Sequence, residues 1–338
     1  MFAQPRMLIR AASPLLEPMN STSASVSHKL RKSRFYYSVI GLLLLLIFVE
    51  FGLRLVLGLG HPILYELDPS FGYFTQPHQY TRRLFARTST NSLGMRSPEF
   101  TIEKPAGALR LMFLGDSITF GTTQVDQGSI FAEEVRKDLS IMLHRQVEEI
   151  NASANGWAIS NEDGFLHSRG TYNSDDVVLV LNSGDLDQPF SRFSDVAGGQ
   201  TNSPRTAIGE LITRLMMLRN RFSHQDAGTT VENDPATERK NLQELTSMAE
   251  FSRGHGSGFL LVFVPFRREI VDGAASSIPG PLKDWAASEN INYLDLTSAV
   301  SGYETQAITL RDGTHYNARG NRLLADSLEN YLADKFSK

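Results

Sequence analysis

The chain contains no cysteine in its 338 residues. It therefore forms no disulfide, no thiolate metal site and no cysteine nucleophile, and it lacks the residue that a lipoprotein anchor acylates. An excess of charge of one sign is lacking too, because the net charge is only −4, and nothing suggests a general nucleic-acid binder. Internal repeats are absent. The length suits one large α/β domain with appended segments.

Long hydrophobic runs are absent with one exception, residues 35–60. As a helix this segment is about 39 Å long, enough to cross a bilayer. Its only charges, Glu50 and Arg54, stand one helical turn apart, where they are able to pair. The basic residues before it are Lys29, Arg31, Lys32 and Arg34. Their position predicts a single-pass anchor in the inner (cytoplasmic) membrane, with the N-terminus inside and the remainder periplasmic. A cleaved signal peptide is the rival interpretation.

Three further segments have a distinct composition. Residues 1–34 are the expected cytoplasmic tail, in which Ser, Ala and Pro predict disorder. Residues 61–108 show no sustained periodicity and are interpreted as a lead-in segment that packs on the catalytic domain, or else as an extended linker. Residues 192–235 are long for a connection and suggest a lid, although a solvated basic helix face is the alternative. The arginines of that segment include Arg205, Arg214, Arg219 and Arg221.

From residue 109 onward, apolar strand patterns alternate with helical patterns. Strands are predicted at 109–114, 147–151, 176–181, 259–264 and 291–296. Helices are predicted at 129–143, 160–170, 207–222 and 318–336, and after an Asp234 cap. This alternation over 109–338 predicts a three-layer α/β/α sandwich with a mostly parallel sheet.

The first strand of this domain runs directly into a small turn, Gly115-Asp116-Ser117. In parallel α/β sheets, catalytic and ligand-binding residues lie beyond the carboxyl ends of the strands, and Ser117 is at such a position. Taken alone, the tripeptide is also typical of an ordinary helix-capping turn.

A carboxylate and an imidazole stand three residues apart near the end of the chain, at Asp312 and His315. A serine hydroxyl attacks an ester when an imidazole removes its proton, and the same imidazole returns that proton to the leaving oxygen. A carboxylate on the other ring nitrogen fixes the tautomer. Ser117, His315 and Asp312 are therefore candidates for acyl transfer. Taken alone, His315 is also typical of a surface histidine beside a helix start.

These two blocks resemble the SGNH (GDSL-like) hydrolase family. Gly115-Asp116-Ser117-Ile118-Thr119 with Gly121 is similar to its first sequence block. Asp312-Gly313-Thr314-His315 is similar to its last block, Asp-x-x-His before a helix. The resemblance covers about residues 109–332 and implies a flavodoxin-like fold without a cofactor or metal. It also implies that Ser117 is the nucleophile, His315 the general base and Asp312 the carboxylate that orients it.

The resemblance further implies an oxyanion hole that includes the backbone N–H groups of Ser117 and Gly156, although Gly156 is also typical of a plain turn after a strand. The family's third block places an asparagine where this chain has Gly184. Four alternatives remain for the third donor: the Gly184 N–H, the Asn182 side chain, the Asn155 side chain, or no third donor.

Two acidic residues beside these blocks are expected to support the site, as is Asn155. Asp116 belongs to the first block, and Asp185 follows Gly184. Two roles are possible for Asp185: it either forms hydrogen bonds with the loop backbone or acts directly in the site.

The sequence therefore predicts a membrane-anchored, extracytoplasmic serine esterase that removes acetyl or other short acyl groups from a glycan or glycoconjugate. Expected partners are an acylated glycan or other small ester, the membrane through residues 35–60, and envelope polysaccharide machinery. An O-acyltransferase that modifies an exopolysaccharide shares the same acyl-serine and is the first alternative. A non-catalytic envelope component is the second, and the missing asparagine at 184 favours it.

Overall fold

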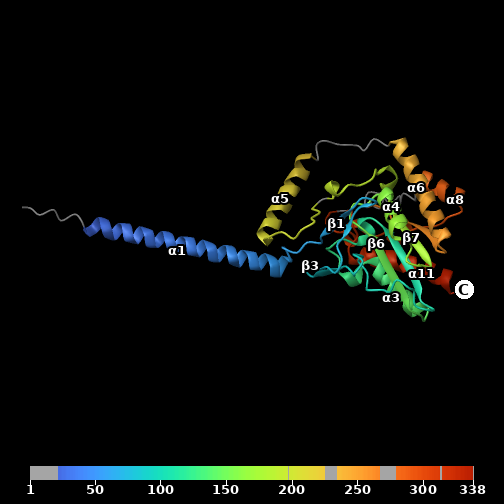
Figure 1. Ribbon diagram of the computed structural model, residues 1–338, viewed down its shortest axis with the longest axis horizontal. Coiled ribbons are helices and arrows are strands. Elements are labelled where there is room, and N and C mark those ends of the chain that lie inside the picture. Colours follow the sequence, from blue (N-terminus) through green and yellow to red (C-terminus); the bar gives the residue numbers. More distant parts are fainter. Residues whose placement is uncertain (1–21, 197, 225–233, 267–278, 313, 338) are drawn as a thin grey trace, which may run out of the picture. The chain divides into compact units, whose positions relative to one another are not determined.

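The computed structural model describes residues 22–196, 198–224, 234–266, 279–312 and 314–337 (Figure 1). The chain divides into two units, Met1–Phe51 and Gly52–Lys338. Helix α1 (Thr22–Gly52) continues into a π-helical turn, η1 (Leu53–Leu57). Ser33–Leu57 is long and apolar enough to cross a membrane, with a mean hydropathy of 2.5, and a signal sequence passes the same test. Of the tail expected to be disordered, 1–21 lies outside the described residues, and the part from Thr22 is helical instead.

A five-stranded parallel sheet forms the centre of the second unit. Its strands are β5 (Leu109–Gly115), β6 (Val147–Ser153), β7 (Asp176–Leu181), β8 (Gly258–Phe263) and β9 (Asn292–Asp295). Their spatial order is β6-β5-β7-β8-β9. The chain leaves β5 for β6 on one side and returns to β7 on the other side. The carboxyl ends of β5 and β7 therefore border a topological switch point, the usual ligand site of such sheets.

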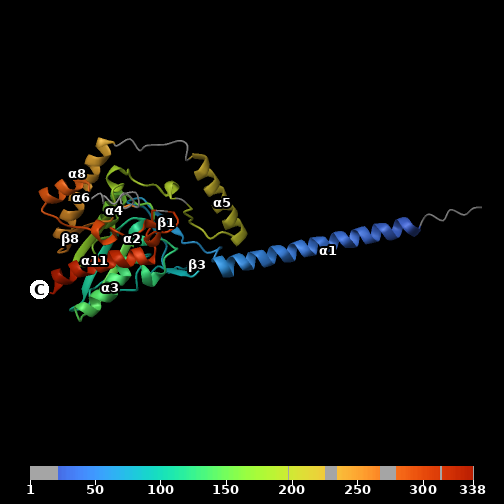
Figure 2. The ribbon, with the colours of Figure 1, turned by 180° about the vertical axis from the view of Figure 1, so that it is seen from behind.

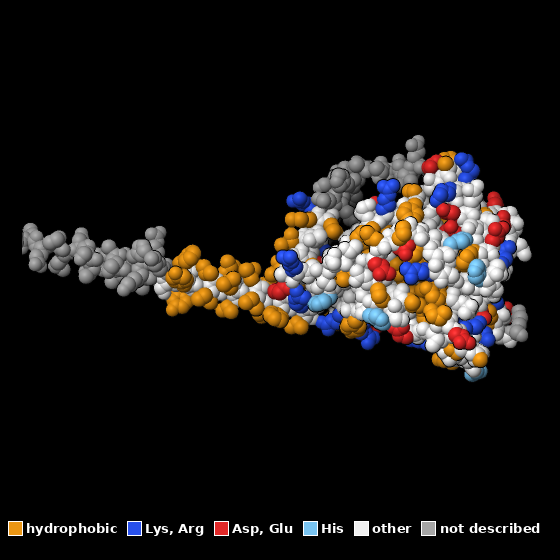
Figure 3. All heavy atoms as spheres, viewed as in Figure 1, with side chains coloured by type: hydrophobic (Ala, Val, Ile, Leu, Met, Phe, Trp, Pro, Cys, Tyr) orange, Lys and Arg blue, Asp and Glu red, His pale blue; other side chains and the backbone are white. Residues whose placement is uncertain are grey.

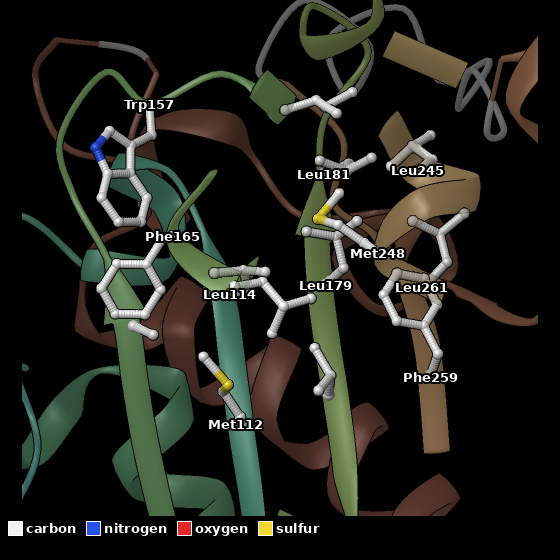
Figure 4. Packing of buried hydrophobic residues seen from close by; sticks show 14 of the residues in the cluster. Met112, Leu114, Trp157, Phe165, Leu179, Leu181, Leu245, Met248, Phe259 and Leu261 are labelled. Atoms are coloured by element: carbon white, nitrogen blue, oxygen red, sulfur yellow. The ribbon is translucent and has the colours of Figure 1, made fainter. Parts of the chain in front are cut away.

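Helices cover both faces of this sheet. Along β5, Leu111 and Phe113 face a cluster completed by α3 (Phe131–Met142) and α11 (Ala318–Phe336). The alternate residues Met112 and Leu114 face a second cluster, completed by α4 (Ile159–Arg169), α6 (Pro235–Gly254) and α8 (Gly280–Ser288) (Figure 4). Figures 1 and 2 show the two helix layers on opposite sides of the strands. The sequence-based prediction of a three-layer α/β/α sandwich is confirmed.

The segment 61–108 contributes side chains to the same core. It forms two antiparallel hairpins, β1 (Tyr65–Asp68) with β2 (Gly72–Thr75), and β3 (Tyr80–Arg83) with β4 (Ala86–Ser89). Phe71 and Phe74 are buried in contact with Trp157 and Phe165, with ring centroids 4.9–6.0 Å apart. Buried aromatic pairs of this geometry stabilise the fold beyond their area burial.

The predicted elements agree with the structure in place and type and differ at their ends. The strand expected at 147–151 continues to Ser153, and the helix expected at 129–143 begins at Phe131. Asp234 caps α6 as predicted, since its carboxylate accepts the N–H of Ala236 at 3.0 Å. The remaining elements are α2 (Ser117–Phe120), η2 (Gln127–Ser129), η3 (Asp185–Asp187), η4 (Phe193–Asp195), α5 (Ala207–His224), α9 (Thr297–Val300) and α10 (Thr305–Ile308).

Candidate active site

The turn that follows β5 holds Ser117 at the first position of the short helix α2. Asp116 caps this helix, because its side chain accepts the N–H of Ile118 at 2.7 Å. Gly115 is required by close packing, since a Cβ there would lie 2.3 Å from Thr119 Oγ1 and 2.9 Å from the Val180 carbonyl oxygen. The Ser117 side chain is partly exposed at the carboxyl edge of the sheet, as the sequence predicts.

A second loop, between α10 and α11, carries Asp312 and His315. The backbone on either side of it is fixed, because Leu310 N–H donates to the His315 carbonyl at 2.8 Å and Asn317 N–H donates to the Ile308 carbonyl at 2.9 Å. The phenolic hydroxyl of Tyr316 donates to the Pro265 carbonyl at 2.5 Å. These contacts attach the loop to the end of β8. Gly313, inside this loop, lies outside the described residues.

The structure brings the three predicted side chains together. His315 Nε2 is 2.8 Å from Ser117 Oγ, and His315 Nδ1 is 2.8 Å from Asp312 Oδ2. The other carboxylate oxygen of Asp312 accepts the N–H groups of Thr314 at 3.0 Å and of His315 at 3.1 Å. Partial burial raises the pKa of Asp312, but these hydrogen bonds outweigh burial and lower it to about 2. The carboxylate therefore stays ionised and holds the imidazole with Nε2 toward the serine.

The turn after β6 contains Gly156 with φ +79°, a conformation that favours glycine. The Asn155 carbonyl accepts the Tyr73 hydroxyl at 2.9 Å, and the Gly156 carbonyl accepts Gln188 Nε2 at 3.2 Å. Among the described residues, the backbone N–H groups of Gly156 and Ser117 have no hydrogen-bond partner. Gly115 and Ser153 are neighbours in the sheet, so both N–H groups lie beyond the same edge.

The alternatives for a third oxyanion donor each bond to another group of the protein. The N–H of Gly184 donates to Asn182 Oδ1 at 2.8 Å. Asn182 Nδ2 donates to Asp185 Oδ1 at 2.9 Å and to Asp116 Oδ2 at 3.4 Å. Asn155 Nδ2 donates to the Tyr65 hydroxyl at 3.0 Å. Each candidate thus has a partner within the protein, which favours the alternative with two donors, although the Asn155 amide carries a second hydrogen. The assignment of Gly184, Asn182 or Asn155 as third donor stays a prediction.

Buried acids lie behind the nucleophile turn. Burial, reinforced by the charge of Asp116, raises the pKa of Asp185 well above its ordinary value, although the Asn182 N–H and amide oppose this. Burial, and then the charges of Asp185 and Asp116, likewise raise the pKa of Glu162 on α4. Asp185 bonds the loop backbone, because it accepts the Asn182 N–H at 2.8 Å. This contact agrees with the structural one of its two expected roles.

Arg96 was not recognised from the sequence, yet it fixes the loop after the nucleophile. Its fully buried guanidinium donates to the carbonyl oxygens of Phe120 at 2.7 Å, Thr122 at 2.5 Å and Val125 at 2.8 Å. Burial lowers its pKa to about 9 despite the charges of Asp126 and Glu149. Tyr73 was missed in the same way. Both residues come from 61–108, where only the abundance of aromatic and basic residues gave a signal.

Among the described residues, no group of three or more His, Cys, Asp or Glu side chains has an arrangement that could hold a metal ion. The described part of the segment 192–235 is mainly α5. Arg205, Arg214 and Arg219 are exposed there, and the Arg221 side chain and residues 225–233 lie outside the described part. The lid assigned to this segment stays a prediction.

No protein-family model matches the chain, and no curated protein matches it. Solved structures do. A lipase/acylhydrolase from Enterococcus faecalis matches at 17% identity over 67% of this chain and 96% of that one, with a TM-score of 0.42. A psychrotrophic esterase from Pseudoalteromonas sp. matches at 13% identity over 68% and 99%, with a TM-score of 0.40.

A two-domain esterase active on acetylated mannans matches at 18% identity over 68% of this chain and 50% of that one, with a TM-score of 0.44. This chain thus spans half the length of that protein. All three are ester hydrolases.

Proposed function

We propose that the chain is a serine ester hydrolase in which Ser117 is the nucleophile, His315 the general base and Asp312 the group that orients the base. The observation that carries this proposal is the pair of 2.8 Å hydrogen bonds that links the Ser117 hydroxyl to Asp312 through the imidazole. An isolated serine is a poor nucleophile, and this arrangement is the one that makes it reactive.

The reaction proceeds in two halves. Ser117 Oγ attacks the ester carbonyl carbon while His315 Nε2 takes the hydroxyl proton. The bond from that carbon to the alcohol oxygen then breaks, and the alcohol leaves with the proton from His315. In the second half, His315 removes a proton from water, the resulting hydroxide attacks the acyl-serine, and Ser117 recovers its proton as the free acid departs.

The unpaired N–H groups of Ser117 and Gly156 are the two oxyanion donors in this proposal. Each such donor typically contributes about 2.7–4 kcal/mol to transition-state stabilisation. A chain with two donors is therefore expected to hydrolyse esters more slowly than one with three.

A polar cavity beside the oxyanion turn supports a hydrophilic substrate. Its volume is about 140 Å³, and Tyr65, Thr123, Asn155 and Arg214 are among the residues that line it. Asn155 directly precedes Gly156. Although Asn155 and Arg214 already bond to Tyr65 and Glu210, their remaining amide and guanidinium hydrogens offer sugar hydroxyls more partners than they offer an alkyl chain. We assign acetyl or another short acyl group on a glycan or glycoconjugate as the substrate, within reach of envelope polysaccharide machinery.

Anchoring through Ser33–Leu57 completes the proposal. Positive charges at Lys29, Arg31, Lys32 and Arg34 support a cytoplasmic N-terminus in the inner membrane and a periplasmic catalytic domain. Because the chain has no cysteine, the variants Ser25→Cys and Asn330→Cys each carry a single thiol. Labelling intact spheroplasts with a membrane-impermeant maleimide then tests the orientation. Only the Asn330→Cys variant is expected to be labelled. The mass of the purified protein decides against a cleaved signal peptide if residues 1–60 are retained.

The activity itself is tested with purified protein and nitrophenyl acetate, with and without a glycan acceptor. If acetate release requires Ser117 and its rate does not change when the glycan acceptor is added, the hydrolase is supported. Acetate that appears on the glycan instead of in solution assigns the transferase. Absence of turnover with every short acyl ester would leave the binding role as the better account.

A further inference from the structure

Large apolar side chains are exposed where the chain enters the second unit. Leu55 and Val56 of η1 are 68% and 64% exposed. The turn between β3 and β4 presents Leu84 and Phe85, and Phe85 is 93% exposed. A single exposed phenylalanine is ordinary, but a contiguous group of exposed apolar side chains is typical of an interaction surface.

Helix α5 buries a charged residue and exposes apolar ones, the reverse of the arrangement usual for a helix on the surface of a water-soluble domain. Glu210 on one face is buried, and it accepts the Gly60 N–H at 2.6 Å and pairs with Arg83 at 2.6 Å. The opposite face carries an exposed apolar stripe of Ile212, Leu215 and Met216. The buried Glu210 thus faces the protein, whereas these three apolar side chains are about half exposed (47–55%) on the opposite face.

Hydrogen bonds hold these three segments together. Leu84 N–H donates to the Leu57 carbonyl at 3.3 Å, and the Arg82 guanidinium donates to the Leu55 carbonyl. Arg54 Nη2 donates to the Arg205 carbonyl at 3.4 Å, just before α5. We call Leu55, Val56, Leu84, Phe85, Ile212, Leu215 and Met216 the exit surface. In Figure 3, orange side chains and blue arginines gather over α5 and the neighbouring edge of the second unit.

Cations border this surface. Arg82, Arg205 and Arg219 are exposed beside its apolar residues. An apolar stripe flanked by arginines is typical of a helix that lies in the interface of a membrane with anionic lipids. Leu55 and Val56 belong to the last turn of the apolar helix Ser33–Leu57, so the exit surface begins where that helix ends.

We infer that the exit surface is a lipid-binding surface, on which the second unit rests against the leaflet where the chain leaves the bilayer. Leu55, Phe85 and Met216 would enter the boundary between headgroups and acyl chains, and the arginines would bind anionic headgroups. The occupant is phospholipid of the same membrane, because the surface is continuous along the chain with the proposed span. This inference rests on the proposed anchor and is independent of the esterase chemistry.

The absence of cysteine makes the test direct. Full-length chains with one cysteine each, Phe85→Cys, Met216→Cys, Ile141→Cys or Leu45→Cys, are labelled with an environment-sensitive fluorophore. They are reconstituted in nanodiscs of phosphatidylethanolamine and phosphatidylglycerol. Lipids brominated near the headgroup quench a fluorophore in the interface, and lipids brominated near the midplane quench one in the bilayer centre. Ile141 is the matched control, since it is 70% exposed at the end of α3.

The inference predicts loss of most fluorescence at 85 and 216 with the shallow bromines and no loss at 141. Strong quenching at 45 with deep bromines, but none at 85 or 216, would overturn the inference and leave the anchor standing. No quenching at 45 would instead remove the anchor and the inference with it. Labels at 85 and 216 that are shielded only at high protein concentration would assign the surface to a second copy and also overturn the inference.

Discussion

The hydroxyl of Tyr73 donates a 2.9 Å hydrogen bond to the carbonyl oxygen of Asn155. In a trans peptide the C=O and N–H point in opposite directions, so this bond also fixes the direction of the Gly156 N–H. A residue far outside both sequence blocks thereby orients a group assigned to the oxyanion hole.

Tyr73→Phe removes this hydroxyl and keeps the buried ring. Loss of one neutral hydrogen bond costs about 1 kcal/mol, so we expect kcat to fall roughly fivefold with little change in KM. Steady-state kinetics with nitrophenyl acetate measure both constants. Tyr331→Phe on α11 is the control, because it removes a tyrosine hydroxyl elsewhere in the chain. A change in KM alone would argue against this role for Tyr73.

Asp312→Asn keeps the shape of the side chain but removes the charge that holds the imidazole. The wrong tautomer then faces Ser117, and we expect kcat to fall by about 10³–10⁴-fold. The variant is expected to fold but to unfold at a somewhat lower temperature, because the hydrogen bonds that lower the pKa of Asp312 also stabilise the folded state. Activity within tenfold of wild type would refute the assignment of Asp312.

Gly184 stands where the family that the sequence blocks resemble has an asparagine, and a Cβ there would lie 3.1 Å from the Phe266 ring. We therefore expect Gly184→Asn to gain activity only when Phe266→Ala makes room. In that background a new amide donor is predicted to raise kcat about tenfold, a fraction of the usual effect of an oxyanion donor. Gly184→Ala in the same background is the control, and equal rates for the two variants would contradict the account with two donors.

Glu149 on β6 is 2% exposed, and burial raises its pKa to about 8 from an ordinary value of 4.5. The folded state thus holds a proton that the unfolded chain releases, so this group's contribution to stability is full below pH 4.5 and is lost as the pH rises toward 8. The loss is up to about 1.4 kcal/mol per pH unit. In urea unfolding between pH 4.5 and 8, the free energy of unfolding of Glu149→Gln should fall less steeply with pH than that of the wild type. An unchanged slope in the variant would show that Glu149 is not its source.

The sheet was predictable because β5 and β7 are buried on both faces and read as continuous apolar runs. The proximity of Ser117, His315 and Asp312 was predictable because these residues lie in two short motifs, Gly115-Asp116-Ser117 and Asp312-x-x-His315. The hairpins of 61–108 were not predicted because each strand has only four residues, and the sequence of these strands shows no clear alternation of apolar and polar residues.

The supporting residues of the site depend on contacts between distant segments. Arg96 meets the Phe120 carbonyl and Tyr73 meets Asn155 only after the chain folds, so neither position has a local signature. The occupation of Gly184 N–H by Asn182 is likewise a matter of loop conformation. Sequence spacing placed both residues in the right loop without fixing where their donors point.

Labelling with a fluorophosphonate tests the central claim most directly, because this probe forms a stable bond only with an activated serine. Intact-mass and peptide mass spectrometry are expected to find one adduct per chain, located at Ser117. The adduct should be absent in Ser117→Ala and formed far more slowly in His315→Ala. Folded wild-type protein that stays unlabelled, or that carries the adduct on another residue, would contradict the account.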